Sequence, residues 1–351
     1  MRFGLFSLMT QRERSQSPRQ IYTQTLEHVR LAEQMGFDVA WFAEHHFSNY
    51  CLCPSPLAMG MFAAPQTSRI RLGPAVIVAP LYQPLRLLEE IAMLDIVSDG
   101  RLVLGLGSGY QQYEFHKFGA DLKAGRDILL ETLDVLEMFL QGGRLEYAGK
   151  HLRIPETYFS VRPIQARPEI YIAGLLNDPV AQQRIARSGY VPIFTTGWSG
   201  LDDIRRQRDT VAAAHRAAGK DAAAVQFAIQ QYIFVTDDRG EAEQAADAAR
   251  YIRRIAASMR ENYARLDGAY LQEIPGGEEP PLSELVDRMI IGDPETVAEK
   301  LVVEAGALKL THLSCFMALP GLPQARVLRS MERFGAEVMP RIEAARTRAA
   351  A

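Results

Sequence analysis

An acid and two histidines stand side by side in the stretch 41-WFAEHHF-47, and a loop with two cysteines follows. Three readings fit these residue types: a metal site, an acid–base cluster built on a histidine, or the polar end of an ordinary strand. A metal site has little support, because Cys51 and Cys53 form C-x-C rather than a zinc spacing. We predict no metal and take Glu44, His45 and His46 as candidate catalytic residues. A purely structural histidine pair remains the alternative.

A second informative stretch is 105-GLGSGYQQYEF-115, in which every second residue is glycine at the start. Such glycines let the backbone approach a ligand closely. The pattern lacks the following helix signature of a dinucleotide fingerprint. Arg126 begins an expected helix soon afterwards and could pair with a phosphate, or could equally be a surface cap or part of a salt bridge.

The elements that must position these residues alternate between strand and helix. Apolar runs of strand length cover 2–7, 38–43, 70–81, 102–107, 169–174, 191–196, 226–235 and 311–317. Segments with helical spacing follow them at 18–36, 55–66, 84–100, 126–139, 178–189, 200–218, 239–263 and 322–337. Most of the strands are apolar throughout, which is typical of parallel strands buried on both faces. Eight strand–helix units predict an α/β fold of the (β/α)8 TIM-barrel type.

In such a barrel the active site lies at the carboxyl ends of the strands. The acid–histidine cluster follows the second predicted strand, and the glycine-rich stretch follows the fourth. Both should therefore lie at the same open end. We expect one domain over 1–351, with an extended insertion at 142–168. A segment rich in Gly, Pro and Glu, 264–292, is expected to be a mobile lid before the eighth strand.

Composition narrows the class of protein. The net charge of −3 gives no field that would attract nucleic acid or an anionic membrane. We find no apolar run long enough to span a bilayer and expect no signal peptide. Three cysteines without framework spacing suit a reducing cytoplasm.

Taken together, three runs resemble the bacterial-luciferase-like family of flavin-dependent oxidoreductases. They are GFDVAWFAEHHF, RLGPAVIVAPLYQPLRLLEEIAMLDIVSDGRLVLGLGSGYQQYEF and IIGDPETVAEKL. The resemblance is dense over 1–130 and returns near 290–302. Members of this family fold as (β/α)8 barrels with insertions, in agreement with the alternation of elements.

The resemblance implies a flavin site at the barrel mouth that holds FMN or a related deazaflavin. His45 stands at the position of the family's catalytic histidine, and a non-prolyl cis peptide is expected between Ala75 and Val76. Arg126 matches a phosphate-binding arginine, whereas Ser108 stands where many relatives carry another arginine. The expected cofactor contacts are Ala75, Val76, Gly107, Ser108, Gly109, Tyr110, Arg126, Asn177, Asp178 and Thr196. Gly107 replaces the reactive cysteine of the luciferases, so light emission is not implied.

The resemblance further implies a monooxygenase that uses reduced FMN and dioxygen, by way of a flavin hydroperoxide, to oxygenate a small apolar substrate such as an aldehyde or ketone. His45 would donate or accept the proton, while Glu44 and His46 would orient it. A separate NAD(P)H-flavin reductase would supply the reduced FMN, because the chain has no Rossmann glycine motif. A homodimer is expected. The alternatives are a deazaflavin-dependent oxidoreductase that transfers hydride, and a non-catalytic barrel subunit that stabilises a partner.

Overall fold

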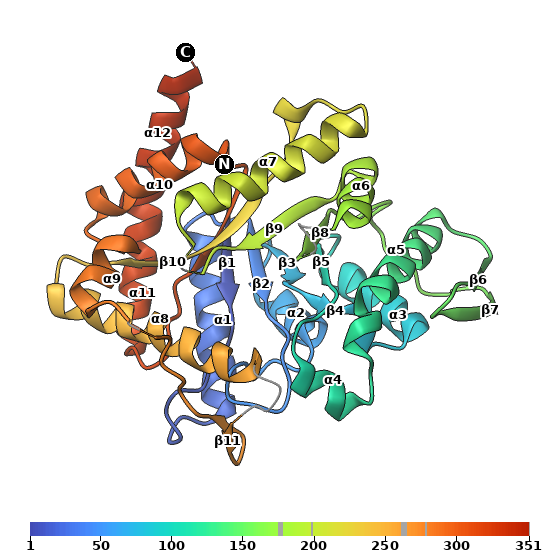
Figure 1. The fold of residues 1–351 in the computed structure, drawn as a ribbon, viewed down its shortest axis with the longest axis horizontal. Helices are drawn as coiled ribbons and strands as arrows, with labels where there is room; N and C mark the ends of the chain where they lie inside the picture. Colours follow the sequence, from blue (N-terminus) through green and yellow to red (C-terminus); the bar gives the residue numbers. More distant parts are fainter. Residues whose placement is uncertain (175–177, 198, 261–264, 278, 351) are drawn as a thin grey trace.

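A ring of parallel strands forms the centre of the computed structural model, which describes residues 1–174, 178–197, 199–260, 265–277 and 279–350 (Figure 1). The ring follows the order β3-β2-β1-β14-β10-β9-β8-β5-β4. Its strands are β1 (Arg2–Ser7), β2 (Val39–Phe42), β3 (Arg71–Pro74), β4 (Ile77–Val78), β5 (Leu104–Gly107), β8 (Ile170–Ala173), β9 (Val191–Thr195), β10 (Ala228–Val235) and β14 (His312–Phe316). All eight predicted strands are present, with β3 and β4 as two parts of one of them.

The ring is nearly closed between its two ends. β4 pairs with β5, and a parallel bridge joins Leu72 of β3 to Leu102 just before β5. Every residue of β2 and β14 is buried, as expected for strands covered on both faces. The predicted (β/α)8 barrel is therefore confirmed.

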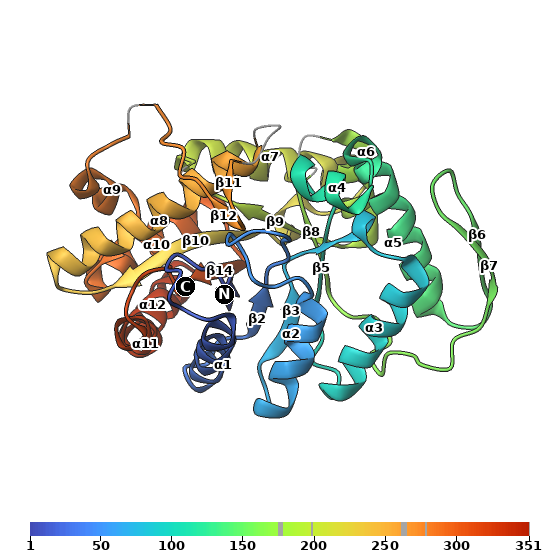
Figure 2. The same cartoon turned by 90° about the horizontal axis from the view of Figure 1, so that it is seen from below.

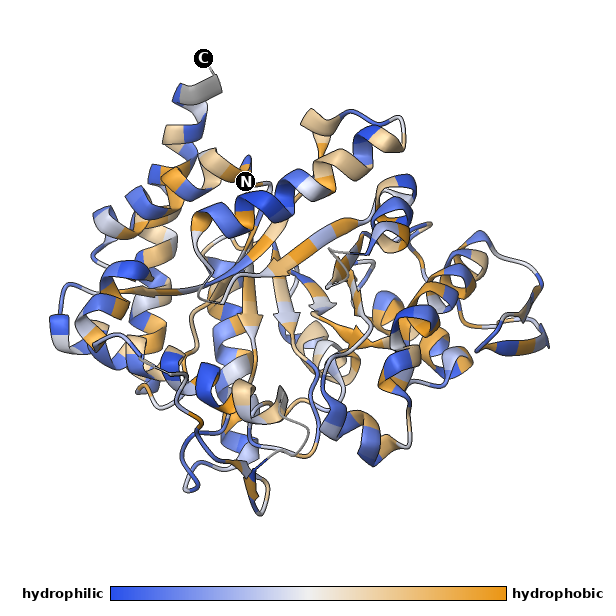
Figure 3. Ribbon diagram, in the orientation of Figure 1, coloured by the Kyte–Doolittle hydropathy of each residue, from blue (hydrophilic) through white to orange (hydrophobic). Residues whose placement is uncertain are grey.

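Helices surround the strands, as the view from below shows (Figure 2). The longer ones are α1 (Pro18–Gln34), α2 (Pro56–Ala63), α3 (Pro84–Val97), α5 (Gly125–Gln141), α6 (Pro179–Ser188), α7 (Leu201–Ala217), α8 (Arg239–Arg260), α10 (Pro294–Leu308), α11 (Gln324–Arg333) and α12 (Met339–Ala350). Several begin with proline after a capping side chain. Ser17, for example, accepts a hydrogen bond from the Gln20 N–H ahead of α1. Hydrophobic residues gather on the strands and hydrophilic ones on the outer helix faces (Figure 3).

Two short helices interrupt segments that the sequence suggested to be loops. α4 (Gln112–Phe118) follows the glycine-rich stretch, and α9 (Leu282–Arg288) lies within the expected lid. Both have seven residues, too short for a helical repeat to stand out from the sequence.

The two expected insertions contain regular elements. Residues 142–168 include an antiparallel hairpin of β6 (Leu145–Ala148) and β7 (Arg153–Thr157). Residues 264–292 include a tight hairpin of β11 (Leu266–Asp267) and β12 (Tyr270–Leu271). They end in β13 (Ile290–Gly292), which pairs with β10. That end of the segment is thus part of the sheet, while the role of the remainder as a lid stays a prediction.

Candidate active site

The acid–histidine cluster lies directly after β2, where the chain leaves the barrel, and its three side chains are buried. The relevant partner comes from another loop. Glu114 of α4, in the segment that follows β5, reaches back to both histidines. The two stretches singled out from the sequence therefore meet at the carboxyl end of the barrel.

His45 is held by one carboxylate. Its Nδ1 lies 2.9 Å from Oε1 of Glu114, and the same oxygen accepts the backbone N–H of His46 at 2.9 Å. Because a carboxylate only accepts, Nδ1 carries the proton and Nε2 points the other way. The Tyr110 hydroxyl lies 3.4 Å from that Nε2. The pair thus presents Nε2 of His45 for proton exchange with a ligand.

Glu44 and His46 form a second pair beside the first. His46 Nε2 lies 3.0 Å from Oε1 of Glu44. The other carboxylate oxygen accepts the N–H of Val78 at 3.1 Å and the hydroxyl of Tyr82 at 2.9 Å. Burial, with the Glu44 carboxylate adding to it, raises the pKa of Tyr82, so that phenol stays protonated as a donor. Glu44 therefore ties the loop after β2 to β4, which fits an orienting role.

Aromatic rings surround the histidines. The rings of Tyr50 and His45 meet edge-on with centroids 4.8 Å apart, and Tyr110 approaches His45 at 5.7 Å. Phe118 lies edge-on to His46 at 4.7 Å and also contacts Phe47. Phe47, Tyr110 and Phe118 are each nearly half exposed. This surface can pack against a planar ring or an apolar substrate.

The cis peptide expected between Ala75 and Val76 is present in the break between β3 and β4. The glycines of β5 pack closely against that break. A Cβ on Gly105 would lie 2.3 Å from the Pro74 carbonyl oxygen, and one on Gly107 would lie 2.7 Å from the Val76 side chain. Gly109 adopts φ +75°, a conformation that favours glycine. These glycines therefore serve packing and turning of the backbone, and a role in cofactor contact stays a prediction.

Arg126 and Asp178, both predicted to contact the cofactor, contact each other. The Arg126 guanidinium donates to both oxygens of Asp178 and lies 2.6 Å from Oδ1 of Asp127. Asp178 also caps α6 by accepting the N–H groups of Val180 and Ala181, each at 2.9 Å. The guanidinium lowers the pKa of Asp178 below its ordinary value, so the carboxylate stays ionised. A phosphate would have to compete with this carboxylate for Arg126.

The remaining predicted contacts are less informative. The hydroxyl of Thr196 lies 2.8 Å from the Gln230 carbonyl oxygen and 2.7 Å from Oε1 of Gln231. It therefore already has hydrogen-bond partners on β10. Ser108 makes a long contact of 3.4 Å with the Gly109 carbonyl oxygen. Asn177 lies outside the described residues.

Glu114 is the residue that the sequence did not reveal. It stands inside the quoted stretch 105–115, but it lies 69 positions beyond His45. Its importance depends on α4 turning its side chain back toward β2, and a helix of seven residues gives no such signal. The sequence offered one hint: Glu114 is an acid shortly after the end of a strand, and His45 in the loop after another strand still needed a partner.

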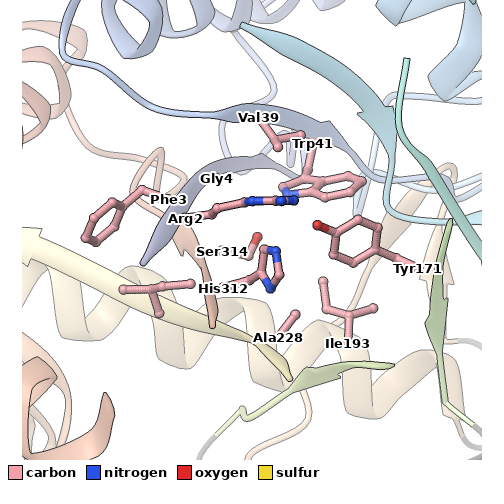
Figure 4. Close-up of a pocket in the computed structure, with 11 residues that line it drawn as sticks. Arg2, Phe3, Gly4, Val39, Trp41, Tyr171, Ile193, Ala228, His312 and Ser314 are labelled. Atoms are coloured by element: carbon pink, nitrogen blue, oxygen red, sulfur yellow. The ribbon is translucent and has the colours of Figure 1, made fainter. Parts of the chain in front are cut away.

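The opposite end of the barrel holds a small cavity of ≈ 10 Å³ (Figure 4). The residues that line it include His312, Tyr171, Ser314, Trp41 and Arg2. Its volume corresponds to about one water molecule, far too small for a flavin. Within the described ranges we find no group of three or more metal-binding side chains and no helix able to cross a membrane.

Comparison with known proteins places this geometry in context. The family model described as "Luciferase-like monooxygenase" matches residues 1–309. The uncharacterized protein y4vJ of Sinorhizobium fredii is 36% identical over 345 residues, covering 98% of each chain. The oxygenase component of flavin-dependent trigonelline monooxygenase from Acinetobacter baylyi is 25% identical, covering 97% of this chain and 95% of that protein.

Solved structures share the fold. The oxygenating constituent of 3,6-diketocamphane monooxygenase from Pseudomonas putida, in complex with FMN, has a TM-score of 0.78 and 22% identity over 97% of this chain and 98% of that one. The coenzyme F420-dependent tetrahydromethanopterin reductase of Methanopyrus kandleri has a TM-score of 0.72 and 19% identity over 97% and 99%. At these identities the likeness concerns the fold alone, and both kinds of flavin coenzyme occur within it.

Proposed function

The chain belongs to the family of luciferase-like monooxygenases, and from this premise we propose that it is a flavin-dependent monooxygenase acting with reduced FMN and dioxygen. The substrate we propose is a small apolar organic molecule such as an aldehyde or ketone. The observation that carries the proposal is the contact between His45 and Glu114 at the carboxyl end of the barrel. An imidazole with a fixed tautomer at this place suits proton transfer beside a bound ring.

The roles of the residues follow from their contacts. Bound reduced flavin would supply the electrons that activate dioxygen. Glu114 holds the proton of His45 at Nδ1, so that Nε2 can accept a proton from, or return it to, the reacting group. The Tyr110 hydroxyl adds a second polar group beside that nitrogen. Tyr50 and the rings near His46 would keep water from the reacting atoms.

FMN is proposed on the resemblance and on the FMN-bound neighbour of similar fold. Ala75, Val76 and the loop from Gly107 to Tyr110 would face the ring, and Arg126 would reach the phosphate by exchanging one of its carboxylate partners. The second candidate is a hydride-transferring enzyme that uses a deazaflavin. It is supported by the F420-dependent neighbour, which has a similar fold.

We propose a separate NAD(P)H-flavin reductase as partner, because the trigonelline relative is named as an oxygenase component. A homodimer is proposed through the outer faces of α2 and α3, where Phe62, Met93, Ile96 and Val97 are exposed. A cytoplasmic location fits three cysteines that are all buried and unpaired.

The test is reconstitution. The purified protein, with a flavin reductase, NAD(P)H, FMN and oxygen, should oxidise members of a panel of aldehydes, ketones and aromatic compounds, with matching oxygen consumption. Tight binding and reduction of the deazaflavin, together with no oxygenated product from reduced FMN, would contradict the proposal and favour the second candidate.

A further inference from the structure

Asn49 joins the loop after the two histidines to the hairpin of β11 and β12. Its backbone N–H donates to the Ala269 carbonyl oxygen at 2.8 Å, and its Oδ1 accepts the Leu271 N–H at 2.9 Å. Asn49 is 1% exposed. The hairpin, 266–271, is therefore fastened from within by a buried residue, through both its backbone and its side chain.

The same side chain reaches two further parts of the molecule. Its amide nitrogen donates to the Gln11 carbonyl oxygen at 2.8 Å and to the Tyr251 hydroxyl at 2.9 Å. Gln11 lies in the loop after β1, and Tyr251 lies on α8. With both amide hydrogens and its carbonyl oxygen engaged, asparagine is the side chain that these partners require. Aspartate has no amide hydrogens to donate, and alanine removes all three bonds.

Exposed side chains also connect the hairpin to the loop after β1. Arg14 forms an ion pair with Asp267, and its guanidinium lies 4.3 Å from the centre of the Tyr270 ring. Both partners of that ion pair are more than half exposed, so the ion pair contributes little to the stability of the hairpin's attachment. Figure 1 shows β11 beside the loops that follow β1 and β2. We call Asn49 together with hairpin 266–271 the clasp.

The clasp lies next to the candidate active site along the chain and in space. Tyr50, the residue after Asn49, packs its ring against His45. Ser48, the residue before it, contacts Met259 of α8 with its hydroxyl 3.8 Å from the sulfur. Release of the hairpin would thus loosen the loop that carries the ring packed on His45.

We propose that Asn49 is a positioning residue that fastens hairpin 266–271 at the carboxyl end of the barrel and so keeps oxygen activation coupled to substrate oxidation. This inference rests on the proposed function. In a coupled turnover, reduced flavin gives two electrons, one oxygen atom joins the substrate and the other leaves as water. When water or solvent protons reach the site early, both oxygen atoms leave as hydrogen peroxide and the flavin is oxidised without product.

The experiment compares three variants with the wild type in the full reductase-coupled system. Asn49→Ala removes the three side-chain bonds of Asn49, Tyr251→Phe removes one of them, and Asp267→Asn removes the exposed ion pair. Hydrogen peroxide released per oxygen consumed should rise about three- to tenfold in Asn49→Ala. It should rise less in Tyr251→Phe and stay unchanged in Asp267→Asn. Free reduced FMN also releases peroxide, so each protein is used at the same concentration of folded chain and in excess over FMN, which keeps a loss of stability from raising this ratio.

Hydrogen exchange gives a second readout that needs no flavin. Amides of the hairpin should exchange about tenfold faster or more in Asn49→Ala, with the barrel strands unchanged. A peroxide ratio equal to that of the wild type overturns the inference, whatever the exchange shows. Unchanged exchange overturns it as well, because the hairpin would then be held without Asn49. A wild type that forms no oxygenated product with reduced FMN and oxygen would instead refute the proposed function.

Discussion

The barrel buries a histidine at each end, and the two have different partners. His45 at the carboxyl end is 9% exposed and His312 at the amino end is 8% exposed. His45 faces the carboxylate of Glu114, whereas Nδ1 of His312 lies 2.8 Å from the hydroxyl of Thr311. Burial is therefore nearly equal, and the partner is what distinguishes the two sites.

The surroundings of His312 favour a neutral ring. Burial lowers its pKa to about 4, and the charge of Glu169 only partly opposes this. The Thr311 hydroxyl is 3.0 Å from the Phe227 carbonyl oxygen, to which it donates, so it accepts the proton of His312 Nδ1. Among the described residues Nε2 of His312 has no hydrogen-bond partner. The amino end thus holds a buried, neutral imidazole, and the carboxyl end holds the one that we propose takes part in the chemistry.

The largest expected effect comes from removing the imidazole at the carboxyl end. In His45→Ala, product formation should fall about 10²- to 10⁴-fold, the usual contribution of a positioned acid or base. Because the ring is buried against Tyr50 and bonded to Glu114, the melting temperature should also fall, so turnover is compared per folded protein. The matched control is His312→Leu at the other end, which should keep turnover close to the wild type. Turnover by His45→Ala equal to the wild type would favour the non-catalytic subunit.

The pH dependence of stability tests the other half of the comparison. The pKa of His312 is about 4 in the folded chain, against about 6.5 for an unfolded histidine, so the unfolded state takes the proton first. The neutral His312 ring contributes to the free energy of unfolding, and this contribution is fully present above pH ~6.5. It is lost as the pH falls toward ~4, by about 3 kcal/mol in total.

Denaturant titrations across this range should show a shallower loss in His312→Leu than in the wild type. His28, whose pKa burial also lowers to about 4, is present in both proteins and cancels in the difference. Parallel curves would mean that His312 does not titrate in this way.

A smaller effect is expected from the partner of His45. Glu114→Gln keeps the size of the side chain but removes the charge that fixes the tautomer. A hydrogen bond to a charged group contributes about 1.5–3 kcal/mol, so turnover should fall roughly 10- to 100-fold. A shifted pH–rate profile with nearly unchanged KM would identify a positioning role, and Glu114→Asp should recover part of the activity. Loss of substrate binding alone would point to a different role for Glu114.

The sequence was sufficient for the ring of strands because apolar runs such as β10 and β14 are buried on both faces. The sequence also predicted that His45 lies at the carboxyl end of the barrel, because it directly follows a barrel strand, and its catalytic role stays a prediction. The sequence could not predict which side chains contact each other across the barrel. The contact of Glu114 with His45 and that of Asp178 with Arg126 depend on how separate loops fold back.

Contacts between distant residues also explain why the sequence described segment 264–292 incompletely. The composition of 264–292 suggested irregular chain, yet its last residues join the sheet as β13 and its hairpin is held by Asn49. A residue 222 positions away cannot be assigned such a role from local pattern. The cis peptide at Ala75 came from the family resemblance and not from any property of the residues themselves.

The smallest effect is expected at the rim of the amino end. Glu169 accepts from Arg2 at 2.6 Å and from Arg71 at 2.8 Å, and these side chains are partly exposed. Such pairs contribute up to about 1 kcal/mol, so Glu169→Gln should lower the melting temperature by about 1–3 °C. The effect should shrink in concentrated salt, which screens exposed charges. Turnover should stay unchanged, because this ring of charges lies at the end opposite to His45. A clear loss of turnover with little change in melting temperature would show that the two ends are coupled, and the division between a stabilising end and a reactive end would then fail.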